Sequence, residues 1–589
     1  MTCRKYSLDC ASFEMGEKEE DILRSAEQSS VPLPASTVVL DFPGRKNRRL
    51  NLNPVSVVPS RRTAETLRPP RMGNAGDNDM HKVTRWALVA SLLCLSACQE
   101  QIPTPTVERL PTGTVGPVGP AMAEYGLLGF RWDDRSPFRA GLTSTELGVL
   151  ERMPGASAYQ IDVRIAADMS RLDVIQEARY TNQESEPLSE VYLRLFPRLF
   201  GAPMLIHSVL LDGAEAATIL ELGDSALRLS FPEALQPGEQ SVIRIDFQVQ
   251  VPTEAEGNYG IFGYVDDILA LAHFYPMIAV FDDEGWNIEI PPPYGDVVYA
   301  DSSFYLVQVS APKAATIVAS GVEIARQDDG DVQRVTFAAG PMRDFFVAAS
   351  TEYALVSRQV GETTVRSYAP AHLSEGAEAA LDYTASALRV FGERVGSYPF
   401  TELDVVSTPT LALGVEYPGI VAMAIRLYPP VTSYPPEYLE STMAHEVSHQ
   451  WFYSVVGNDQ LDEPWLDEAM AQYATLLYFR DLYGPEGAAG FRSSLEARWD
   501  RVERDKIPIG MPVASYTGLE YGAIVYGRGP LFVETLAKRM GEEAFAGFLE
   551  DYYDTHKWGI ASGSDFRAMA ESQCGCDMMA LFQEWVYSQ

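Results

Sequence analysis

Residues 442–452 read TMAHEVSHQWF, and this stretch decides what the second half of the chain has to build. Positions four apart lie on one face of an α-helix, so His445 and His449 can aim their imidazoles at one point. Zinc accepts neutral imidazole readily, and two ligands one turn apart are a common way to hold it. Glu446 lies beside this pair, where its carboxylate can take a proton from zinc-bound water. The stretch therefore predicts a helix with two metal ligands and a general base.

A third ligand is expected from Glu468, nineteen residues after His449. Residues 462–464 (Asp-Glu-Pro) predict the start of a second helix, and residues 484–485 (Gly-Pro) predict its end. We expect the first helix to end at residues 457–458 (Gly-Asn), so that a short loop places the two helices antiparallel. The pattern predicts one Zn²⁺ per chain, held by two histidines and a glutamate with a fourth position open for water, as in catalytic sites. The alternative is that Glu468 is a solvated helix carboxylate.

The length and charge of the chain limit its class. At 589 residues it is too long for one hydrophobic core, so two or three domains are expected. A formal net charge of −35 repels the phosphates of nucleic acids, and we expect no nucleic-acid partner. Nothing in the sequence indicates an oligomeric state.

The N-terminal part of the chain is expected to contain no folded domain. Residues 1–79 carry little apolar periodicity. They precede a signal sequence, which belongs at a start, so we interpret them as an upstream extension or a gene-model error; a disordered N-terminal region is the alternative. Residues 80–97 have the basic beginning and apolar middle of a signal peptide and are too short to span a membrane permanently.

The signal peptide ends in Leu-Ser-Ala before Cys98, which resembles the bacterial lipobox. The resemblance implies cleavage before Cys98 and a lipid on its sulfur, which would anchor the protein to a membrane without a spanning helix. The alternative is an ordinary secretory signal that ends near a cysteine. Residues 98–124 are expected to be a linker. We therefore expect a lipoprotein of the bacterial cell envelope that faces outside the cytoplasm, with the redox state of Cys574 and Cys576 left open.

Two kinds of periodicity divide the rest of the chain. Residues 125–358 contain many short runs that alternate with period two, such as residues 242–249 (VIRIDFQV), and these predict an antiparallel β saddle or sandwich. Residues 359–589 change to helical periodicity, with a helix expected over residues 375–394 and a small sheet near residues 400–425. The expected fold class is α+β and multidomain, with the metal site in the second, mostly α-helical domain.

Two further positions could take part in the chemistry. Residues 411–421 predict a strand that runs into a turn. Glu416 in this strand is either an edge-strand carboxylate or faces the cleft and holds a substrate ammonium. Tyr526 is either a packed aromatic or a donor to a developing oxyanion. The residues alone leave both questions open.

Together these motifs resemble the gluzincin metallopeptidases of the aminopeptidase N and leukotriene hydrolase type, clearly from about residue 370 and weakly before. The predicted ligands and base match the family's H-E-x-x-H and its later glutamate, with WLDE at residues 465–468 where W-L-N-E is usual. Residues 414–417 (GVEY) keep the glycine and glutamate of the family's G-x-M-E-N, residues 526–529 (YGRG) match the tyrosine of Y-E-K-G, and residues 579–587 are similar to the family's domain end.

The resemblance implies a thermolysin-like zinc peptidase domain and aminopeptidase activity on peptides with a free N-terminus. In that role Glu446 is the base, Tyr526 helps zinc to stabilise the oxyanion, and Gly414 and Glu416 bind the substrate, with Glu416 on its α-ammonium.

Two departures from the family pattern limit this expectation. A glutamine-containing motif that helps to bind the substrate amine in this family is not found, because residues 274–284 differ in its neighbourhood. The printed chain ends at Gln589, where we expect no counterpart of the family's C-terminal helical domain. A thermolysin-like zinc endopeptidase and a catalytically silent envelope binding protein on the same fold therefore remain alternatives.

Overall fold

Alternating burial explains the strands of the first half of the chain. In the computed structural model, which describes residues 127–255 and 257–587, strand β8 (Gln240–Gln250) buries every second side chain from Ser241 to Val249. A sheet with one face on a hydrophobic core requires this period. The predictions for the upstream extension, the signal peptide, Cys98 and the linker lie outside the described residues.

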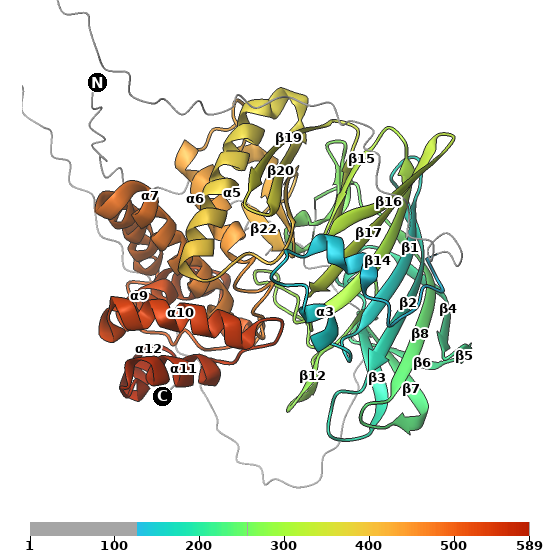
Figure 1. Cartoon of the computed structure of the whole chain (residues 1–589), viewed down its shortest axis with the longest axis horizontal. Helices are drawn as coiled ribbons and strands as arrows, with labels where there is room; N and C mark the ends of the chain where they lie inside the picture. The colour runs from blue at the N-terminus through green and yellow to red at the C-terminus, as the bar shows by residue number, and fades with distance from the viewer. Residues whose placement is uncertain (1–126, 256, 588–589) are drawn as a thin grey trace, which may run out of the picture. The chain divides into compact units, whose positions relative to one another are not determined.

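Strand β8 belongs to an eight-stranded sheet that forms the main layer of the first half (Figure 1). In spatial order the sheet contains β16 (Val322–Asp329), β17 (Val332–Met342), β14 (Ser303–Pro312), β1 (Ala158–Ile165), β2 (Arg171–Thr181), β8, β4 (Met204–Leu211) and β5 (Ala214–Glu215). Only β1 and β14 pair in parallel; the other neighbours are antiparallel.

Smaller sheets and two short helices complete the β-rich half. One four-stranded sheet contains β15 (Thr316–Ala319), β18 (Val347–Ser350), β10 (Ile268–Leu271) and β9 (Phe262–Val265). Another contains β11 (Met277–Ile278), β3 (Leu188–Arg194), β7 (Ala226–Leu235) and β6 (Ala217–Glu221). The other elements include the β12–β13 hairpin (Phe281–Asp282, Gly285–Trp286), α3 (Val149–Arg152) and α4 (Phe196–Leu199).

A five-stranded sheet opens the second half. Its order is β19 (Tyr353–Val360), β20 (Thr363–Pro370), β21 (Glu402–Thr408), β23 (Ile420–Ala424) and β22 (Gly414–Tyr417). The expected boundary at residue 358 falls inside β19, which pairs along its whole length with β20. The chain therefore passes from the sheets of the first half to this sheet between β18 and β19. A boundary inside β19 would divide the β19–β20 hairpin and break its main-chain hydrogen bonds.

Helices form the rest of the second half, and this order of a β-rich part before a helical part confirms the α+β class (Figure 1). Helix α5 packs against β19, β20 and α6. The helices are α5 (Ser374–Arg394), α6 (Pro436–Ser448), α7 (Trp465–Asp500), α8 (Gly518–Ala523), the π-helical turn η6 (Ile524–Arg528), α9 (Gly529–Met540), α10 (Glu542–His556), α11 (Gly563–Cys574) and α12 (Met579–Trp585).

The ends of the two helices that carry the predicted metal site differ in part from expectation. Helix α7 begins after Pro464 as predicted, and it is broken at Gly484, although it continues beyond this kink to Asp500. Helix α6 was expected to reach residue 457 but ends at Ser448. The chain then turns, with a positive φ of 119° at Tyr453. The carbonyl oxygen of Tyr453 accepts a hydrogen bond from Arg343, which lies outside the helix.

One buried arginine joins the two halves of the molecule. Arg343 follows β17 and is 2% exposed. Its guanidinium donates to the carbonyl oxygens of Ala300 (2.8 Å), Tyr453 (2.6 Å), Val455 (3.3 Å) and Gly559. One side chain therefore binds four main-chain acceptors from both halves, of which Val455 and Gly559 also accept a main-chain hydrogen bond.

Two features bear on the environment of the protein. Cys574 and Cys576 form a disulfide. Within the described part of the chain, none of the helices combines the length and the apolar composition that a bilayer crossing requires.

Candidate metal centre and active site

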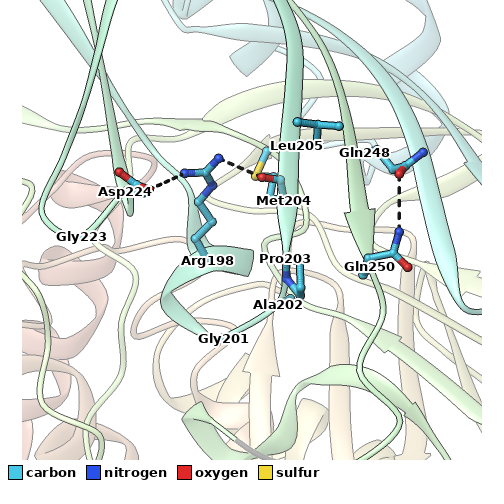
Figure 2. Close-up of a pocket in the computed structure, with 10 residues that line it drawn as sticks. All are labelled: Arg198, Gly201, Ala202, Pro203, Met204, Leu205, Gly223, Asp224, Gln248 and Gln250. Carbon is cyan, nitrogen blue, oxygen red and sulfur yellow. Dashed lines mark hydrogen bonds and ion pairs between the residues drawn. The ribbon is translucent and has the colours of Figure 1, made fainter. Parts of the chain in front are cut away.

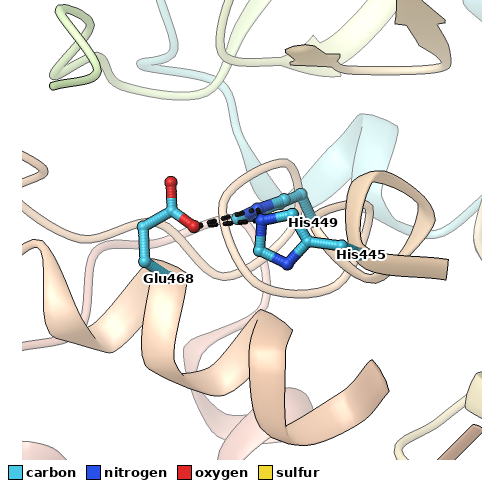
Figure 3. Close-up of side chains that lie close together, drawn as sticks. All are labelled: His445, His449 and Glu468. Carbon is cyan, nitrogen blue, oxygen red and sulfur yellow. Dashed lines mark hydrogen bonds and ion pairs between the residues drawn. The ribbon is translucent and has the colours of Figure 1, made fainter. Parts of the chain in front are cut away.

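The three predicted ligands meet between the end of α6 and the start of α7 (Figure 3). Their nearest ligand atoms all lie within 4.8 Å of one another. Oε2 of Glu468 is 3.1 Å from Nε2 of His445 and 3.6 Å from Nε2 of His449. Although α6 ends one residue earlier, His449 keeps helical backbone angles (φ −64°, ψ −12°), so its side chain stays on the face of His445.

The tautomer of His449 is fixed by a residue that sequence reasoning missed. Asp467 Oδ1 lies 2.5 Å from Nδ1 of His449, and Gln460 donates to the other carboxylate oxygen. Nδ1 therefore carries the proton, and Nε2 presents its lone pair to the site. The motif WLDE places Asp467 next to the predicted ligand Glu468 in sequence. No periodicity in the sequence indicates that Asp467 contacts Nδ1 of His449, the ring nitrogen that faces away from the metal site.

This donor set fits zinc. Nε2 of His445 and Nε2 of His449 lie 3.3 Å apart, so the two imidazole edges face each other with a carboxylate oxygen beside them. All three residues are at most 8% exposed. Two imidazole nitrogens and one carboxylate that converge in a buried place form the ligand set of catalytic zinc sites.

Glu446 is buried on the strand side of this centre, against Gly414 of β22. A methyl group on Gly414 would lie 2.5 Å from Cγ and 2.6 Å from Oε1 of Glu446. Only a glycine therefore leaves room for this carboxylate. Burial and the neighbouring charge of Glu416 raise the pKa of Glu446 well above its usual range. Glu416, 7% exposed, thus faces the cleft rather than solvent.

Tyr526 reaches the same centre from the π-helical turn η6. Its hydroxyl donates to Oε1 of Glu468, the oxygen that does not face the histidines. Two residues later, Arg528 donates to the carbonyl oxygens of Ile507, Glu584 and Trp585. The turn that carries Tyr526 is therefore tied to the end of α12.

A second residue that sequence reasoning missed comes from the β-rich half. Asp296 lies between β13 and β14 and is half-buried beside Glu468. Burial and the charges of Glu468 and Asp467 raise its pKa well above the usual range. It shares a small cavity of about 30 Å³ with Glu416 and Tyr259. No local pattern identifies Asp296, because the two glutamates beside it, Glu416 and Glu468, are more than one hundred residues away in sequence.

A larger cavity lies elsewhere in the described structure. It has a volume of about 440 Å³ and opens on the β-rich half, where β4 and β8 contribute Met204 and Gln248 to its wall (Figure 2). Its one cation, Arg198, pairs with Asp224 at 3.3 Å and donates to the main-chain oxygen of Met204 at 2.8 Å. These charges satisfy each other, so the cavity offers no catalytic group.

The comparisons with known proteins agree with this geometry. A family model described as the peptidase family M1 domain matches residues 379–585. Aminopeptidase 2 of Candida albicans is 22% identical over 395 residues, which are 64% of this chain and 42% of that protein. Aminopeptidase N of Streptomyces lividans is 23% identical over 402 residues, which are 65% of this chain and 45% of that one. The chain thus spans less than half the length of these curated relatives.

Solved structures share the fold. An M1 zinc metallopeptidase from Deinococcus radiodurans superposes with a TM-score of 0.56 at 20% identity, over 74% of this chain and 93% of that chain. The predicted resemblance is therefore confirmed for the fold and the family. Residues 379–585 form a domain of peptidase family M1, the gluzincin family of aminopeptidase N.

Proposed function

We propose that this chain is a zinc-dependent aminopeptidase that removes N-terminal residues from peptides. One observation carries the proposal: His445, His449 and Glu468 converge on one buried point, with the carboxylates of Glu446 and Glu416 next to it. A metal ligand set alone would suit many hydrolases. The second carboxylate favours a substrate with a positive charge close to the bond that is cut. The Deinococcus radiodurans M1 metallopeptidase solved with a Tyr-Ser-Ala substrate supports short peptides as the substrate class.

Each side chain has a defined task in this reaction. When bound, zinc lowers the pKa of a coordinated water towards neutrality and polarises the scissile carbonyl. Glu446 accepts the proton of the attacking water and passes it to the leaving nitrogen. The hydroxyl of Tyr526, held at Glu468, is placed to donate a hydrogen bond to the carbonyl oxygen as it becomes negative. Glu416 pairs with the α-ammonium and sets the cut one residue from the end.

Replacing Glu416 should distinguish an aminopeptidase from an endopeptidase. We expect Glu416→Gln and Glu416→Ala to lower kcat/KM for aminoacyl-fluorophore substrates about 10- to 100-fold, mainly through KM, because a charge-assisted hydrogen bond contributes about 1.5–3 kcal/mol. The wild-type protein should cleave the same substrates poorly when their amines are blocked. Glu375→Gln, an exposed glutamate at the start of α5, is the matched control and should change nothing. Equal cleavage of free and blocked substrates would instead support the thermolysin-like endopeptidase.

We also propose that the protein is held at the bacterial cell envelope by a lipid on Cys98. The signal-like residues 80–97 and the lipobox-like ending before Cys98 support this. Acyl chains contribute about 0.8 kcal/mol per buried CH₂ group, so two chains anchor a protein stably.

The Cys98→Ser variant tests the anchor. In a bacterial host, we expect the wild-type protein to incorporate an alkyne-tagged fatty acid and to sediment with membranes. Cys98→Ser should lose the tag and move to the aqueous fraction, with unchanged peptidase activity per molecule. A wild-type protein without tag, or a variant that stays fully on membranes, would contradict the anchor.

A further inference from the structure

The small cavity beside the candidate metal centre has an unusual wall. Three carboxylates line it, from Asp296, Asp344 and Glu416, together with the imidazole of His273 and no lysine or arginine. Asp344 accepts hydrogen bonds from Tyr453 and interacts with His273 at 3.2 Å through one oxygen only. The cavity therefore holds more negative than positive groups.

Several polar atoms in this wall have no partner among the described residues. They are Oδ1 of Asp344, Nδ1 of His273 and the hydroxyl oxygen of Tyr417. These residues are 0%, 4% and 1% exposed, and all three line the cavity. Buried polar atoms without partners cost free energy, so such a site calls for a small polar group with hydrogen atoms to donate.

The size of the cavity limits what can enter. About 30 Å³ gives room for roughly two water-sized groups, which fits an ammonium group or waters but no amino-acid side chain. Asp296 stands at this cavity and also beside Glu468 of the metal centre. It is half-buried, whereas Glu416 is almost fully buried, so Asp296 is the more accessible of the two carboxyl groups.

We propose that Asp296 is a specificity-determining residue, whose carboxylate and that of Glu416 hold the α-ammonium of the substrate between them. An ammonium has three N–H donors, and one buried carboxylate cannot satisfy them all. Asp296 supplies a second acceptor from a different part of the chain, and the positive charge of an ammonium group beside it favours the ionised form of this carboxyl group. This also accounts for recognition of the amine without the glutamine motif that is missing near residues 274–284. The inference rests on the proposed aminopeptidase function.

Tyr259 lines the same cavity and helps to hold its wall in position. Its backbone is in the left-handed region (φ 58°, ψ 12°), which is unfavourable for a non-glycine residue. Its carbonyl oxygen holds Thr410 (2.8 Å) and Leu411 (2.7 Å), which lead into the strand of Glu416. The segment that bears Tyr259 therefore fixes the β-rich wall of the cavity against the strand of the second half.

The test measures binding in zinc-loaded full chains that carry Glu446→Gln, so that slow turnover does not interfere. Calorimetry compares L-leucinamide with 4-methylpentanamide, which has hydrogen in place of the amine. We expect the background protein to bind the amine at least about tenfold more tightly, and Asp296→Asn to remove about tenfold of this preference without changing affinity for the des-amino compound. Asp296→Glu, which keeps the charge, should retain most of the preference. Asp283→Asn, in the exposed β12–β13 turn, is the matched control and should retain all of it.

Each other outcome has a defined meaning. An unchanged preference in Asp296→Asn, or an equal loss of affinity for both compounds, would overturn the proposed role of Asp296. Neither result would contradict the aminopeptidase proposal. Equal loss of zinc from Asp296→Asn and Asp296→Glu would also overturn it, because Asp296 would then support Glu468 rather than the substrate. A background protein that does not distinguish the two compounds would overturn the aminopeptidase proposal itself.

Discussion

Glu446→Gln should lower kcat by roughly 10³- to 10⁴-fold, the upper part of the range for a positioned general base, while zinc content stays at one ion per chain. The amide keeps the shape of the side chain in the space that Gly414 leaves, so the fold should not change. It cannot accept the proton of the attacking water. Because Glu446 is not one of the three converging ligands, zinc binding should be untouched. Steady-state kinetics with an aminoacyl fluorophore and metal analysis of the same sample measure both quantities.

The control for this variant lies on the same helix. Glu437→Gln makes the same chemical change at an exposed position in the first turn of α6 and should leave kcat within about twofold of wild type, since surface substitutions rarely matter. If Glu446→Gln retained near wild-type turnover, another group would have to serve as the base. If it lost zinc as well, the loss of rate would say nothing about proton transfer.

The metal centre could be predicted from the sequence because its geometry is local. His445 and His449 are one turn apart, and the Pro464 signal fixed where the helix of Glu468 begins. One error in the prediction nevertheless left the site unchanged. The first helix is shorter than its pattern indicates, but His449 retains helical angles just beyond its end. The helical period therefore predicted the direction of the His449 side chain correctly. It could not predict the last residue of the helix, because tertiary hydrogen bonds determine that end.

The rest of the site depends on contacts that no local pattern contains. Asp296 comes to Glu468 from the β-rich half, and Asp467 reaches the far nitrogen of His449. The position of β19 likewise follows from its pairing with β20, since period-two alternation does not say which sheet a strand will join. Carboxylates with these roles look like ordinary acidic residues in a chain with a net charge of −35.

The junction between the two halves controls the loop that follows His449. Arg343 binds the carbonyl oxygens of Tyr453 and Val455 in that loop, and those of Ala300 and Gly559 from segments far away in sequence. Arginine suits this task because its planar guanidinium directs several donors at fixed angles. Gly457 packs so close to this guanidinium that a side chain there would displace it.

Arg343→Met should lower the free energy of unfolding by about 3–5 kcal/mol, one of the largest effects that a single substitution in this chain can have. The methionine fills most of the volume, but it leaves the carbonyl oxygens of Ala300 and Tyr453 without their donor and removes one of two donors from those of Val455 and Gly559. Urea denaturation followed by tryptophan fluorescence measures the change, because Trp451 and Trp465 lie fully buried on either side of the affected loop in the sequence.

Two matched variants show whether this loss arises from the hydrogen bonds or from charge. Arg343→Lys keeps the positive charge but presents its donors from one nitrogen, so it should recover less than half of the loss. Arg334→Met removes an exposed arginine from β17, the strand that precedes Arg343, and should change stability by no more than about 0.5 kcal/mol. Full recovery by lysine would mean that charge, and not the four carbonyl contacts, stabilises the junction. A loss of less than about 1 kcal/mol in Arg343→Met would mean that water replaces the guanidinium there, and that the loop after His449 is held by its own turn.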